Sequence, residues 1–168
     1  MSDPDERDGP DVSARPGEAI IRASWAGTAV FAVAAVTAAI VPDALAAPVA
    51  VLDGALFLAG CAAFLAAYGR AVGRSRTDAV SVAGVYLLAG SAPREVQIRL
   101  LGALVVQVVV AVVTASVRLY TSLAFGILVP VYGLGLTGLW GARHGSFSTR
   151  APRAARPPGP GRRGQAGR

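Results

Sequence analysis

The stretch IRLLGALVVQVVVAVVTASV, residues Ile98–Val117, decides the fold of this chain. Beyond Arg99 it carries no charged side chain, and Gln107 near its middle is its most polar residue. About 20 apolar residues in a helix span the hydrocarbon core of a lipid bilayer. Because lipid offers no hydrogen-bond partners, such a segment must satisfy its backbone within a helix or a closed barrel. The stretch therefore predicts a transmembrane helix.

Three further apolar runs are also long enough to span, and they cover residues 20–41, 46–68 and 119–140. Four spans are too few to close a barrel, so each is predicted to be a helix. The sequence thus predicts an all-α fold, a four-helix integral membrane bundle over residues 20–141. Residues 1–19 and 142–168 are polar and contain little to bury, which predicts disordered tails.

The composition is that of a membrane protein and not of a soluble domain. Of the 168 residues, 54% are hydrophobic and 15% are charged, whereas a soluble domain has about 45–50% and about 25%. This length suits about one domain. The 16 lysine and arginine residues are all arginines. The single cysteine, Cys61, excludes a disulfide within the chain.

A fifth apolar run, AVSVAGVYLLAGSA at residues 79–92, is too short to span. Some 14 residues fit an interfacial or re-entrant helix, although the alternation of apolar and polar residues also permits extended structure. We favour the helix. Just after it, Ser91 is predicted to cap the next helix, with Pro93 in its first turn. That helix would then start in water and enter the membrane near Ile98.

The arginines predict the orientation of the bundle. They precede the first span, lie between the second and third, and follow the fourth; only Arg118 falls in the other set of loops. The positive-inside rule then places both termini in the cytoplasm, in a multi-pass protein of the plasma membrane. A rival interpretation is cleavage of the first span at Ala44-Leu45-Ala46, which resembles a signal-peptidase site. Cleavage would leave three spans with the same orientation.

Asp53 stands within the otherwise apolar stretch PVAVLDGALFLAG, residues 48–60. A charge at the centre of the bilayer costs about 2.5–3.5 kcal/mol, and less near an interface. Three roles remain open for this carboxylate. It could form an ion pair with Arg118 or a hydrogen bond that fixes helix packing. It could instead reach water with no special role, or couple the movement of a proton or cation.

Gln107 and the fourth span supply the other candidate positions. Gln107 is expected to form an interhelical hydrogen bond, with the lining of a solute path as the alternative. In the fourth span, Pro130 is predicted to kink the helix. Gly133 and Gly138 begin small-xxx-small pairs, which allow close helix packing within the chain or in a homodimer.

No constellation in the sequence argues for catalysis. His144 is the only histidine and has no neighbouring ligand residues, so no metal and no cofactor are expected. The arginine-rich tail over residues 142–168 favours contact with anionic lipid headgroups. Nucleic acid is disfavoured because the tail lacks interleaved aromatic residues beyond Phe147.

The stretches TSLAFGILVPVYGLGLTGLWGARHGSF (Thr121–Phe147) and LLAGSAPREV (Leu87–Val96) resemble the uncharacterised small multi-pass membrane proteins of actinobacterial type. The resemblance implies a multi-pass membrane fold and assigns no catalytic or binding residue. Because the sequence has small residues suited to close helix packing and no catalytic constellation, we expect a non-enzymatic accessory or interaction subunit of a membrane assembly. The alternative is a homodimeric transporter of a small solute or ion, with Asp53, Gln107 and Arg118 along the path and Pro130 as a flexible point.

Overall fold

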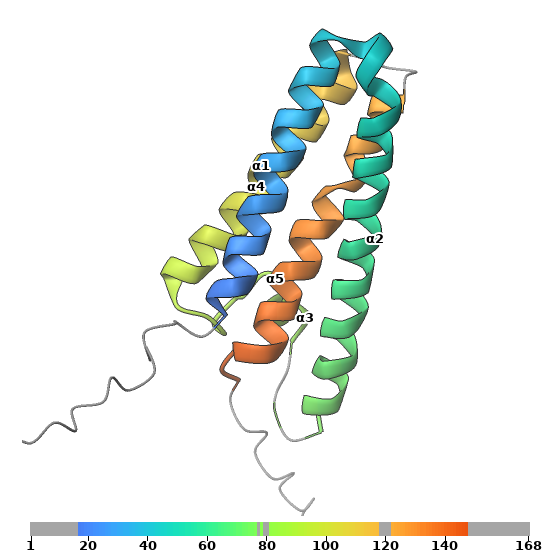
Figure 1. The fold of residues 1–168 in the computed structure, drawn as a ribbon. Helices are drawn as coiled ribbons and strands as arrows, with labels where there is room; N and C mark the ends of the chain where they lie inside the picture. Colours follow the sequence, from blue (N-terminus) through green and yellow to red (C-terminus); the bar gives the residue numbers. More distant parts are fainter. Residues whose placement is uncertain (1–16, 77, 79–80, 118–121, 148–168) are drawn as a thin grey trace, which may run out of the picture.

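A computed structural model describes residues 17–76, 78, 81–117 and 122–147 of the chain. The elements in chain order are α1 (Glu18–Ile40), α2 (Pro42–Arg74), α3 (Val82–Tyr86), α4 (Arg94–Val117), the 3₁₀ helix η1 (Ser122–Leu128) and α5 (Pro130–His144) (Figure 1). Four helical segments are long and apolar enough to cross a membrane: Glu18–Ile40, Asp43–Arg74, Arg94–Val117 and Ala124–His144. The predicted all-α bundle with four candidate spans is therefore confirmed.

The second helix is longer than the sequence indicated. α2 runs for 33 residues, with Pro42 in its first turn and Pro48 inside it, where residues 46–68 were expected. Proline is tolerated at the start of a helix because the N–H that it lacks would have no partner there. At 1.5 Å per residue α2 is about 50 Å long, against a hydrocarbon core of about 30 Å. Its ends therefore extend beyond the apolar layer.

The fourth span is not the continuous helix that the sequence suggested. The 3₁₀ helix η1 ends at Leu128, and α5 begins at Pro130. The proline ring has no N–H to donate to the preceding turn and collides with the carbonyl four residues earlier. The α-helix therefore starts at the proline. Residues 118–121, the expected beginning of this span, lie outside the described residues.

The bundle is built from two pairs of helices. α2 packs along α5, and α1 packs along α4, while η1 lies between α2 and α4 at the upper end of the view (Figure 1). α2 and α5 approach one another closely, because a Cβ atom on Gly135 would lie less than 3.0 Å from the carbonyl oxygen of Gly60. Only glycine at position 135 permits this approach of the two backbones.

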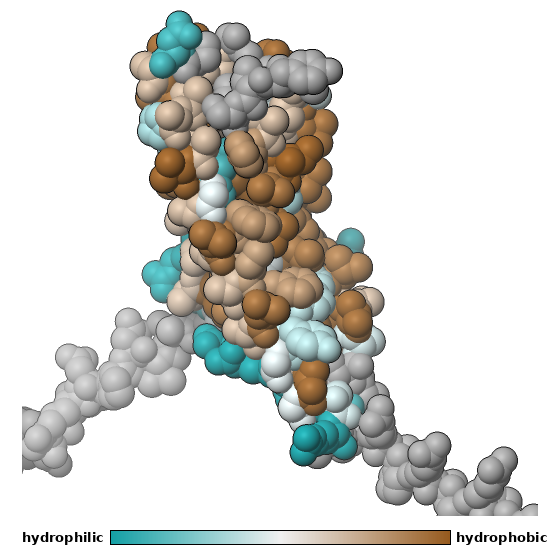
Figure 2. Space-filling model, turned by 90° about the vertical axis from the view of Figure 1, so that its right-hand side faces the viewer, coloured by the Kyte–Doolittle hydropathy of each residue, from teal (hydrophilic) through white to brown (hydrophobic). Residues whose placement is uncertain are grey.

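Charged residues gather at one end of the bundle, which we call the basic end. It is the end where α1 and α4 begin and where α2 and α5 finish, the lower end in Figure 1. The arginines of the described residues belong to it: Arg22, Arg70, Arg74, Arg76, Arg94, Arg99 and Arg143. Figure 2 shows a largely apolar side surface, with hydrophilic side chains more frequent toward this end. The structure thus has the charge asymmetry on which the predicted orientation rests.

The segment before α4 differs from the predicted helix over residues 79–92. Its helical part, α3, is only five residues long, and Ser81 caps it by accepting a hydrogen bond from the N–H of Gly84 (2.9 Å). The chain then turns through Leu88 and Gly90, whose φ angles are 57° and 69°. Ser91 does not make the predicted cap of α4, because its hydroxyl donates to the carbonyl of Gly84.

Candidate functional site

The interior of the bundle holds a polar cluster at Gln107, formed by α1, α4 and α5. The side chain of Gln107 is fully buried. Its Nε2 donates to Thr28 Oγ1 at 2.7 Å, and its Oε1 accepts from the N–H of Gly133 at 3.1 Å. Thr28 Oγ1 in turn donates to the carbonyl of Ser24 at 2.7 Å. Both ends of the amide are therefore engaged by protein groups.

The break at Pro130 explains why Gln107 is needed. The usual i−4 acceptor for the N–H of Gly133 would be the carbonyl of Val129, which instead accepts from the N–H of Tyr132 at 2.8 Å, and no side chain caps α5 locally. In an apolar interior an unpaired N–H is costly. Gln107, supplied by α4, accepts from the N–H of Gly133 and so provides a cap for α5 from another helix. Sequence reasoning placed a polar residue here but missed Thr28 as its partner.

Gly133 and Gly138 make close contacts inside the chain. A Cβ atom on Gly133 would lie 2.5 Å from Gln107 Oε1, and one on Gly138 would lie less than 3.0 Å from the ring of Tyr86. Glycine at these positions thus admits a side chain from α4 and one from α3. Since both glycines are buried, they are not exposed for contact with a second copy of the chain.

Asp53 is the one buried carboxylate among the described residues, with 1% of its surface exposed. Its Oδ1 has no hydrogen-bond partner there. Gly126 of η1 and Phe31 of α1 lie beside it, since a Cβ atom built on Gly126 would be 3.4 Å from both Asp53 Oδ2 and Phe31 Cε2. Arg118, the predicted partner, lies outside the described residues. Ser24 Oγ and Trp140 Nε1 are also buried without a hydrogen-bond partner, but Asp53 is the only ionisable carboxylate in this group among the described residues.

Asp53 and Gln107 occupy neighbouring levels of the interior. Asp53 packs beside Phe31, whereas Gln107 bonds to Thr28, one turn earlier on α1. Their surroundings differ in kind. Gln107 has a partner for each polar atom, while Asp53 faces an aromatic ring and a glycine backbone. Gln107 therefore cross-links helices, whereas Asp53 Oδ1 has no hydrogen-bond partner among the described residues.

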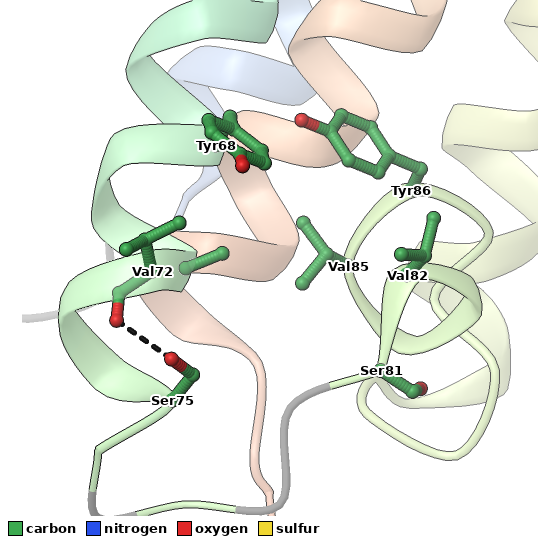
Figure 3. Close-up of a pocket in the computed structure, with 8 residues that line it drawn as sticks. Tyr68, Val72, Ser75, Ser81, Val82, Val85 and Tyr86 are labelled. Atoms are coloured by element: carbon green, nitrogen blue, oxygen red, sulfur yellow. Dashed lines mark hydrogen bonds between the residues drawn. The ribbon is translucent and has the colours of Figure 1, made fainter.

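A small cavity of about 150 Å³ lies between the end of α2 and α3 (Figure 3). Its lining residues are Tyr68, Ala71, Val72, Ser75, Ser81, Val82, Val85 and Tyr86. The rings of Tyr68 and Tyr86 face one another across it, and the hydroxyl of Ser75 turns away to donate to the carbonyl of Val72 at 2.7 Å. These walls suit an apolar group and present no paired nucleophile and base.

Tyr86 ties this cavity to the rest of the bundle. Its ring stacks on Phe64 with centroids 4.4 Å apart, and its hydroxyl donates to the carbonyl of Phe64 at 3.2 Å. Burial raises the pKa of this phenol above its ordinary value, and neighbouring Tyr68 raises it further. A phenol held neutral in this way serves as a hydrogen-bond donor and not as a base.

The described residues contain no group of three or more His, Cys, Asp or Glu side chains arranged to hold a metal ion. His144 packs against the ring of Trp140, with centroids 5.5 Å apart, and Cys61 is a free thiol. Comparison of the chain with protein-family models, curated proteins and solved structures finds no match.

Proposed function

We propose that this chain is a non-enzymatic subunit of a membrane assembly and that it meets its partner through the outer face of α2. The observation that supports this is how little of α2 the bundle covers. Within the apolar segment of α2, 17% of the residues are buried in the described bundle, against 44% in the apolar segment of the fourth span. α2 therefore offers the largest uncovered surface for another helix.

The side chains on that face favour a protein neighbour over lipid alone. Besides Val51, Leu58 and Leu65, small residues are exposed along α2, namely Ala55, Ala59, Ala62, Gly69 and Gly73. The exposed face of α4 instead carries valines, such as Val105, Val109 and Val113. Helices in membranes meet through small residues because these allow the backbones to approach closely. The contrast between the two faces points to α2 as the contact helix.

Purification of the tagged protein from its host's membranes in a gentle detergent tests the proposal, with mass spectrometry of what accompanies it. We expect a different membrane protein in stoichiometric amount, and its loss when Ala62→Leu fills the exposed face of α2. Ala29→Leu is the matched control, because Ala29 is exposed on α1 and should keep the partner. Recovery of copies of this chain alone would overturn the subunit proposal.

Asp53 supports a second candidate, a homodimeric transporter of a small solute or ion. Ionisable residues buried within a membrane mark ion and proton paths more often than chance would place them there. Asp53→Asn keeps the shape of the side chain and removes its charge. In a transporter this variant inserts and accumulates but loses coupled flux in proteoliposomes. If Asp53 acts in packing, the variant accumulates less and shows no specific flux defect.

We also propose that the basic end faces the cytoplasm, so that both termini lie there. The clustered arginines support this through the positive-inside rule. Cys61 is the only cysteine, so Cys61→Ala provides a background for single cysteines introduced at Ser75 and at Asp43. A reagent that does not cross the membrane should label position 43 in whole cells and leave position 75 unlabelled. The opposite pattern would reverse the orientation.

A further inference from the structure

A groove of about 580 Å³ lies between the basic ends of α2 and α5, on different residues from the cavity of Figure 3. It is lined by Arg70, Gly73, Arg74, Ala142 and Arg143. Three of these five residues are arginines and none is acidic. We call it the arginine groove.

Arg74 forms a fixed wall of the arginine groove. Its Nη1 donates to the carbonyl of Ala142 and its Nη2 to that of Gly145, each at 3.1 Å. The guanidinium also lies 5.1 Å from the ring centroid of Phe147. The carbonyls at the end of α5 carry the negative end of the helix dipole. Because Arg74 satisfies them, this negative end does not repel an anion from the groove.

Arg70 and Arg143 provide the available charge. Both side chains are exposed, and neither forms an ion pair with a described residue. Asp78 pairs with the groove residue Arg74 at 3.4 Å, and Glu95 pairs with Arg99 at 2.7 Å outside the groove. The charges of Arg70 and Arg143 are therefore not neutralised by these two acids.

Gly73 gives a ligand room between the arginines. No atom lies within 4 Å of a Cβ built at this position, so the groove is open down to the backbone of α2. Nearer the apolar layer, Tyr68 and Leu65, five and eight residues before Gly73, are exposed on the same helix. Tyrosine is enriched where a membrane-spanning helix leaves the hydrocarbon core. The groove thus lies at the depth of lipid headgroups.

We propose that the arginine groove binds the phosphate of an anionic phospholipid, with Arg70 and Arg143 contacting its oxygens. A guanidinium matches a phosphate with two parallel hydrogen bonds, which an ammonium group does not. Basic pockets between membrane helices bind anionic headgroups for this reason. Gly73 is also one of the exposed small residues of α2 used for the proposed partner, but the groove arginines are not. Lipid retention is measured on the purified chain without a partner, so the two proposals can fail separately.

The test uses the full chain in nanodiscs and in detergent, with native mass spectrometry to count retained phosphatidylglycerol and phosphatidylcholine. We expect preferential retention of phosphatidylglycerol. Arg70→Gln with Arg143→Gln should weaken it about 30-fold, which corresponds to about 1 kcal/mol for each arginine near a charged surface. Arg76→Gln with Arg94→Gln removes the same charge from the same end outside the groove, and should weaken it less than about threefold.

A second variant separates the groove from general charge. Gly73→Leu fills it without removing any charge and should also abolish the preference for phosphatidylglycerol, whereas Gly69→Leu, one turn away in open space, should preserve it. Size-exclusion profiles establish that each variant is folded. Three results would each overturn the proposal. They are an equal loss of phosphatidylglycerol retention in the two double arginine variants, unchanged retention in Gly73→Leu, and release of the lipid by millimolar inorganic phosphate.

Discussion

Replacement of Gln107 by leucine is expected to destabilise the bundle by about 1–3 kcal/mol. Leucine has a similar volume and suits the apolar interior, so the change removes two hydrogen bonds and leaves little empty space. Interhelical hydrogen bonds in membranes average about 0.6 kcal/mol each, which gives about 1.2 kcal/mol for the two. The N–H of Gly133 then has no acceptor in a buried site, and this cost raises the upper value to about 3 kcal/mol.

The measurement is reversible unfolding in mixed micelles, followed by circular dichroism as the denaturing detergent is increased. Gln97→Leu on the same helix is the matched control. Its amide donates to the carbonyl of Leu87 at 3.1 Å in an exposed position, so its loss should cost less than about 0.5 kcal/mol. A double-mutant cycle of Gln107→Leu with Thr28→Val should give a coupling of about 0.6 kcal/mol.

Equal stability of Gln107→Leu and the parent protein would refute the reasoning that the cluster joins α1, α4 and α5. A loss of stability in Gln107→Leu with no coupling to Thr28→Val would refute Thr28 as the hydrogen-bond partner of Gln107. A stability loss accompanied by loss of the helical signal before denaturation would show that the amide is needed for insertion, which the structure does not require.

Three further changes test other contacts. Gly138→Leu places a side chain where the ring of Tyr86 lies, so α3 should be displaced and become cleavable in limited proteolysis; unchanged protection would contradict the contact. Arg74→Gln loses two charge-assisted bonds to carbonyls of α5 and should cost about 1.5–3 kcal/mol, with faster amide exchange in the last turn of α5. Gly135→Leu meets the backbone of Gly60, and we expect little folded protein by size-exclusion chromatography; a normal yield would show that α2 and α5 are less close.

The sequence predicted the spans better than their ends. Spans are set by hydrophobic length, which is local, so residues 98–117 were expected and α4 contains them. The end of α2 at Arg74 was missed because residues 69–74 are too polar to count as span. In the structure residues 69–74 continue α2 beyond the apolar layer. Ser91 was misassigned because its hydroxyl can either accept from a backbone N–H of α4 or donate to a carbonyl, and the fold brings the carbonyl of Gly84 to it.

The alanines of α2 show a second limit. Ala55, Ala59, Ala63 and Ala67 recur every four residues along α2, a spacing that allows helix backbones to approach closely. Four residues rotate a helix by about 400°, so this row of alanines drifts around α2. Ala55 and Ala59 are exposed, whereas Ala67 is fully buried. Sequence spacing alone does not show which of these alanines pack against other helices of the same chain.

By itself the sequence determined that this protein is an all-α bundle with four apolar segments long enough to cross a membrane, since backbone groups in lipid have no partner outside the helix. It also determined that arginines gather at one end. Only the tertiary structure decided which polar groups are satisfied. The partners of Gln107 come from positions 79 and 26 residues away. Because such contacts depend on how helices pack, no local pattern distinguishes the bonded amide of Gln107 from the unbonded Oδ1 of Asp53.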